Sequence, residues 1–158
     1  MKFITSTHLK RWADTRESQS LLPELIRRLI CASVKQLDRL SFPCGDAVHM
    51  HGWDGIVSCP EPIDLVPEGD SLWECGVNKE IQAKANDDII KRAADPLGHI
   101  KSNSTFVFVT PREWAGADAW VIANQSGWKK LVVYTAIELE AWIEKCPAVG
   151  MWLASKLN

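Results

Sequence analysis

The segment from Ser104 to Thr110 constrains the fold of this chain more than any other. Its sequence is STFVFVT, apolar through its centre and followed by Pro111. A continuous apolar run of this length is typical of a strand that is covered on both faces of a sheet. The run from Lys130 to Tyr134, KLVVY, has the same character. We therefore expect both runs to be buried strands of one sheet.

Segments with helical spacing of apolar residues alternate with these strands. A helix is predicted from Glu17 to Ser33, and another from Lys79 to Ala94 with Asn78 as its N-cap. Further helices are expected over residues 114–125, 136–145 and 149–157. Between Phe42 and Val77, short β-like runs separated by Gly and Pro predict a bent hairpin and a third strand. This order predicts an α/β fold, with helices flanking a central mixed sheet.

Length, cysteines and charge limit the class of protein. A chain of 158 residues is expected to form a single domain over residues 1–158, and its end after an amphipathic helix is compatible with a portion excised from a longer chain. Five cysteines without a CxxC pair, and no secretory signal pattern, predict reduced thiols in a cytoplasmic protein. No apolar stretch approaches the roughly 18–20 residues of a membrane span. The net charge of −2 excludes a protein that coats nucleic acid by bulk charge alone.

Two acidic residues lie in otherwise apolar, β-like segments: Asp54 in HGWDGIV and Glu74 in SLWECGV. A carboxylate in such a segment is costly unless a cation or hydrogen bonds compensate it, so both are candidate metal ligands. Mg²⁺ takes oxygen ligands of this kind, usually one or two carboxylates completed by water and substrate phosphate. The alternative for Asp54 is a turn aspartate, because Asp-Gly is a common turn dipeptide.

These segments resemble the PD-(D/E)XK, or restriction-endonuclease-like, nuclease superfamily. The resemblance covers residues 21–134 and rests on the ordered motifs GWDG, VPEGDSLWECG, KAN-D, KR and TFVFVTPREW. They are similar to nuclease-like domains at the N-termini of large bacterial anti-phage NTPases. The resemblance implies a three-layer sandwich in which Asp54 and Glu74 share Mg²⁺ or Mn²⁺. It also implies a DNA endonuclease that acts as a defence effector and self-associates through a larger NTPase or sensor polypeptide.

The superfamily's motif lysine is missing from its usual place, because Gly76 stands two residues after Glu74. Residues i and i+2 of a strand face the same side, so Gly76 leaves space beside Glu74 for a side chain from the following helix. Lys84 shares a helical stripe with Ile81, and the family pattern has a lysine in this KA dipeptide, so we assign the catalytic role to Lys84. Lys79 is the second candidate. The alternative for Lys84 is an exposed lysine paired with Asp88.

Other groupings complete the sequence-based hypotheses. Double-stranded DNA is expected to be held by nearby cations: Arg27, Arg28, Lys91, Arg92 and Lys101. By resemblance, Glu24 on the first long helix is a further candidate for the metal. Cys44, His49, His51 and Cys59 have the donor chemistry of a zinc site, but their spacing matches no standard template. Two rival functions remain: a nuclease-like interaction module without turnover, and a small-molecule enzyme.

Overall fold

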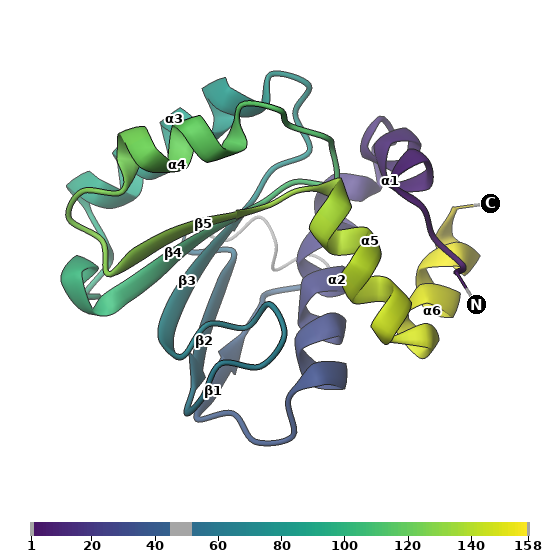
Figure 1. The fold of residues 1–158 in the computed structure, drawn as a ribbon, viewed down its shortest axis with the longest axis horizontal. Coiled ribbons are helices and arrows are strands. Elements are labelled where there is room, and N and C mark those ends of the chain that lie inside the picture. The colour runs from purple at the N-terminus through teal and green to yellow at the C-terminus, as the bar shows by residue number, and fades with distance from the viewer. Residues whose placement is uncertain (1, 45–51, 158) are drawn as a thin grey trace.

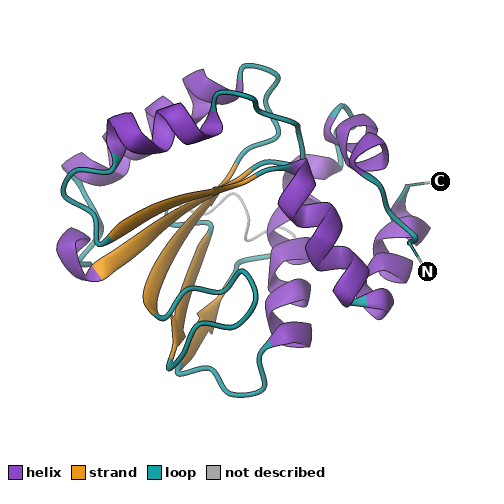
Figure 2. Ribbon diagram, viewed as in Figure 1, coloured by secondary structure: helices purple, strands orange, loops and turns teal. Residues whose placement is uncertain are grey.

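The computed structural model describes residues 2–44 and 52–157, which form five strands and six α-helices (Figures 1 and 2). The strands are β1 (Arg39–Ser41), β2 (Gly55–Cys59), β3 (Gly69–Cys75), β4 (Ser104–Val109) and β5 (Lys130–Tyr134). They lie side by side in chain order in one sheet. The pairs β1–β2 and β2–β3 are antiparallel, and β3–β4 and β4–β5 are parallel. The predicted mixed sheet is therefore confirmed.

Helices cover both faces of this sheet (Figure 1). They are α1 (Ser6–Ala13), α2 (Ser18–Ser33), α3 (Ile81–Ala94), α4 (Ala117–Asn124), α5 (Ala136–Lys145) and α6 (Pro147–Lys156). The connections β3–α3–β4 and β4–α4–β5 place α3 and α4 on one face, while the remaining helices pack on the other. Within the described residues, no helix has the length and apolarity needed to cross a bilayer.

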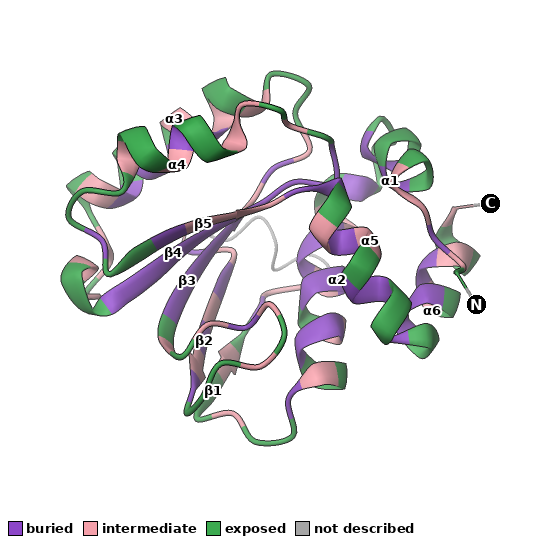
Figure 3. Cartoon of the chain, in the orientation of Figure 1, coloured by how far each residue is buried: buried purple, intermediate pink, exposed green. Residues whose placement is uncertain are grey.

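The sheet separates two apolar clusters; β4 is buried along its whole length, and β3 is buried from Ser71 to Glu74 (Figure 3). Trp73 and Val107 pack toward α2 and α5, whereas Leu72 and Phe106 pack toward α3 and α4. Because side chains alternate along β3, Glu74 lies on the same face as Leu72 and Trp73 lies on the opposite face. Glu74 therefore faces α3.

Several element boundaries differ from the predictions. Helix α1 was not predicted; it begins with a capping box between Thr5 and His8, in which His takes the place usually held by Glu or Gln. Asn78 is not the N-cap of α3, since Glu80 occupies that position without a side-chain cap. The β-like run from 60 to 68 is a connection that contains only the isolated bridge between Ile63 and Val66.

Candidate functional site

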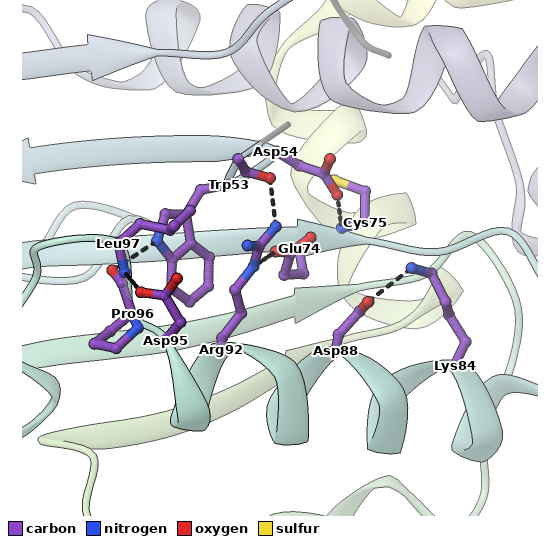
Figure 4. Close-up of polar contacts among 11 residues, drawn as sticks. Trp53, Asp54, Glu74, Cys75, Lys84, Asp88, Arg92, Asp95, Pro96 and Leu97 are labelled. Atoms are coloured by element: carbon purple, nitrogen blue, oxygen red, sulfur yellow. Dashed lines mark hydrogen bonds and ion pairs between the residues drawn. The ribbon is translucent and has the colours of Figure 1, made fainter. Parts of the chain in front are cut away.

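The β2–β3 pairing brings Asp54 beside Glu74. Gly55, the first residue of β2, pairs with Trp73, so the residue before Gly55 lies across from the residue after Trp73. The Oδ2 atom of Asp54 accepts a hydrogen bond of 2.7 Å from the backbone N–H of Cys75 (Figure 4). By accepting this hydrogen bond at the start of β2, Asp54 acts as a turn aspartate would. Its carboxyl group also lies at the end of the sheet next to Glu74. Both roles considered for Asp54 are compatible with this position.

Glu74 is buried on the α3 side and contacts Arg92 of that helix. The Arg92 Nε donates to Glu74 Oε1 at 2.5 Å, and both side chains are 5% exposed. Arg92 also donates to the carbonyl oxygen of Gly52, and its guanidinium lies 4.9 Å from the ring centre of Trp53. Arg92 therefore connects the end of β3 with the segment that leads into β2.

The pKa of Glu74 is raised to about 9. Burial is the largest cause, followed by the charge of Asp54 and a hydrogen bond with it. The charge of Asp88 also raises this pKa, and the hydrogen bond from Arg92 lowers it. The Arg92 contact by itself favours a charged Glu74. The upward direction nevertheless prevails, first because burial disfavours the charged carboxylate and then because Asp54 and Asp88 add negative charge beside it. A proton or an added cation would relieve this charge.

Lys84 fills the space that Gly76 leaves open. A Cβ atom on Gly76 would lie 2.9 Å from Lys84 Cγ and 3.1 Å from Phe108 Cζ, so a larger residue would displace the lysine. The Lys84 Nζ donates to Asp88 Oδ1 at 2.8 Å. Burial lowers the pKa of Lys84, but its hydrogen bond and attraction to Asp88 outweigh burial and raise it. The lysine thus lies beside Glu74 in its charged form and is also paired with Asp88.

These side chains line one cavity of about 320 Å³ at the end of the sheet. Figure 4 shows Lys84, Asp88 and Arg92 extending from one side of α3 toward the strand that carries Glu74. The opposite wall includes Gln19 and Pro23 of α2. Sequence reasoning missed Gln19, although Pro23 is a detectable signal: a proline inside a helix cannot donate to the carbonyl oxygen four residues earlier, which is that of Gln19.

The cations expected to hold DNA do not all gather at this cavity. Lys91 is exposed and lines it. Arg92 lines it too, but is buried and bound to Glu74 rather than free for a phosphate backbone. Lys101 precedes β4, whose first residue pairs with Asp70 at the opposite end of β3 from Glu74, and it lies over Trp128 instead.

The candidate residues on α2, and Lys79, lie in different surroundings. Arg28 pairs with Glu24 at 2.9 Å and lies 4.4 Å from the ring centre of Trp152, so both charged groups belong to the contact between α2 and α6. Arg27 and Lys79 are exposed and do not line the cavity. Of the two candidate lysines, the structure therefore places only Lys84 at the carboxyl groups.

The described residues contain no group of three or more Cys, His, Asp or Glu side chains able to hold one metal ion. The pair Asp54 and Glu74 nevertheless has the donor chemistry that Mg²⁺ uses, because this ion retains several waters. Of the zinc hypothesis, His49 and His51 lie outside the described residues, while the thiols of Cys44 and Cys59 donate to the nearby carbonyl oxygens of Phe42 and Glu61.

Comparison with protein-family models, curated proteins and solved structures finds no match to this chain.

Proposed function

We propose that this chain is a metal-dependent endonuclease domain that cleaves DNA phosphodiester bonds. The observation that carries the proposal is the meeting of Asp54, Glu74 and Lys84 at one cavity, with the lysine occupying the space beside Gly76. Clusters of buried, mutually perturbing titratable groups in a cavity mark functional sites more often than chance. The resemblance to the PD-(D/E)XK superfamily extends the proposal to an effector of anti-phage defence in the cytoplasm, assembled through a larger NTPase polypeptide.

In this proposal, each side chain of the cavity has a separate role. Asp54 and Glu74 would hold Mg²⁺, or Mn²⁺ in its place. When bound, the cation would neutralise part of the phosphate charge and lower the pKa of a bound water molecule. Lys84 stabilises the negative charge that develops on the phosphate and orients the attacking water. Lys91, exposed at the same cavity, is the cation best placed to bind the DNA backbone.

Cleavage of supercoiled plasmid in Mg²⁺ or Mn²⁺ tests this proposal. We expect Asp54→Asn, Glu74→Gln and Lys84→Gln each to lower the cleavage rate at least about 100-fold, as removal of a charge-stabilising group does in other enzymes. Glu68→Gln is the matched control, because Glu68 is exposed at the far end of β3. Wild-type rates in all three site variants would show that the cavity is not the active site.

One observation favours a second function, a nuclease-like interaction module without turnover. Arg92 occupies Glu74 Oε1, and Asp54 Oδ2 is bound to the Cys75 N–H, so part of each carboxyl group is already satisfied within the chain. Titration with Mn²⁺ distinguishes the two functions. A nuclease binds the ion at millimolar concentration or below and loses it in Glu74→Gln, whereas an interaction module binds none.

A further inference from the structure

Asp88 is a buried acid for which the fold itself gives no full explanation. Its side chain is 9% exposed, and its Oδ1 accepts the hydrogen bond from Lys84. Its Oδ2 is buried and has no hydrogen-bond partner among the residues that the structure describes. Leaving a buried acceptor unsatisfied costs about 1–3 kcal/mol, and more for a charged group. The fold would be more stable without this oxygen, which points to a partner that none of the described residues supplies.

The position of Asp88 indicates where that partner lies. Asp88 lines the same cavity as Asp54 and Glu74, one turn of α3 from Arg92 and one turn from Lys84. Lys84 already satisfies Oδ1, and no other described side chain at this cavity, Arg92 included, donates a hydrogen bond to Oδ2. The missing partner is therefore a donor or a cation inside the cavity.

A water molecule fits this position better than direct contact with the ion. No three acidic side chains converge on one point within residues 2–44 and 52–157, so Asp88 does not complete a three-carboxylate ligand set. Mg²⁺ and Mn²⁺ sites commonly keep several waters, and those waters are hydrogen-bonded by acids outside the ligand set.

We propose that Asp88 is a positioning residue of the cation site, whose Oδ2 accepts a hydrogen bond from a water of the ion's hydration shell while its Oδ1 holds Lys84 beside the same water. This inference rests on the proposed function. It adds a third acid to the site, one that acts through water and lysine.

Binding of Mn²⁺ to the full chain, followed by the electron paramagnetic resonance of the free ion, tests the inference without an activity assay. Loss of an outer hydrogen-bonding partner typically weakens metal binding 10–100-fold. We expect Asp88→Asn to weaken Mn²⁺ binding within this range, with a melting temperature no lower than that of the wild type. Asp87→Asn, the same change on an exposed residue of the same helix, is expected to leave both quantities unchanged.

The outcomes separate this inference from the proposed function. Wild-type Mn²⁺ affinity in Asp88→Asn overturns the role of Asp88, while loss of binding in Glu74→Gln still supports the cation site. A wild-type protein that binds no Mn²⁺ overturns both. Asp88→Ala provides a second variant, because alanine suits a helix interior. If neither variant folds, Asp88 is required by the fold and the inference is wrong.

Discussion

At the scale of single residues, the site is defined by an excess of acidic over basic side chains. Asp54, Glu74 and Asp88 face Arg92 and Lys84, and most of these groups are shielded from water. Sequence reasoning found Asp54 and Glu74, because a carboxylate within a buried strand stands out against its neighbours. It assigned Arg92 to the DNA surface, because helical spacing alone does not say which side of α3 faces the sheet.

The raised pKa of Glu74 predicts a stability that falls with pH. The unfolded chain releases this proton near 4.5 and the folded chain retains it to about 9, so the folded state binds more protons between these values. Unfolding free energy therefore decreases as pH rises through this window. Glu74→Gln should remove that slope and gain on the order of 1 kcal/mol or more over the wild type between pH 5 and 8, as one pKa unit is about 1.36 kcal/mol.

Urea denaturation at several pH values measures this difference. Glu68→Gln, which changes an exposed glutamate, should retain the wild-type slope. An unchanged slope in Glu74→Gln would mean that Glu74 ionises in the folded protein as it does in the unfolded chain.

Arg92 is expected to be essential for stability at neutral pH. Arg92→Met removes the hydrogen bonds that the buried guanidinium donates to Glu74 and Gly52 and leaves three carboxyl groups beside one ammonium; hydrogen bonds made by a charged group contribute about 1.5–3 kcal/mol each. The cost should be smaller at pH 5, where the carboxyl groups take up protons more readily. A double-mutant cycle with Glu74→Gln measures the coupling, and additive effects of the two substitutions would show that the contact contributes nothing.

At the scale of elements, the decisive contact is the packing of α3 against the end of β3. The spacing of Lys84, Asp88 and Arg92 along one side of the helix could be deduced from the sequence, as could the vacancy at Gly76. The start of α3 could not, because Asn78 looks like a cap while the helix begins only after Glu80. Helix α1 was missed because its capping box uses His8 in place of Glu or Gln, although Leu9, Trp12 and Ala13 have the spacing of one buried helical face.

Gly76→Ala should test this packing directly. The added Cβ would come within 2.9 Å of Lys84 Cγ and 3.1 Å of Phe108 Cζ, so the lysine must move. Overpacking of this kind costs about 1–3 kcal/mol. Adding Lys84→Ala to Gly76→Ala removes the Cγ atom and should recover part of the lost unfolding free energy. No recovery in the double variant would show that Lys84 does not fill this space.

At the scale of the whole molecule, one arginine connects elements that are distant in the chain. Arg112, which follows β4, donates to the carbonyl oxygens of Val77 and Ala13 and forms an ion pair of 2.8 Å with Asp14. These contacts hold the α1–α2 junction against the segment that follows β3, beside the cavity. Sequence reasoning predicted helices on both sides of a sheet but not this connection, because Val77, Ala13 and Asp14 are all far from Arg112 in the sequence.

Arg112→Met should therefore destabilise the whole fold. Hydrogen bonds made by a charged group contribute about 1.5–3 kcal/mol each to stability when they are buried, and we expect a loss of at least that order in thermal or urea unfolding. Arg16→Met, the same change at an exposed arginine, should have little effect. Equal melting temperatures for the two variants would contradict the connecting role of Arg112.

Among the residues that the structure describes, all those that line the cavity at the end of the sheet lie between Gln19 and Arg92. The later elements, from β4 to α6, support this wall but contribute no lining residue. The cavity and the scaffold that supports it are therefore separated along the sequence as well as in space. The surface of the part from β4 onward can change, through substitution, insertion in the turn after α4 or attachment of another module, without altering a residue that lines the cavity. Such a chain can acquire new partners while its cavity stays the same.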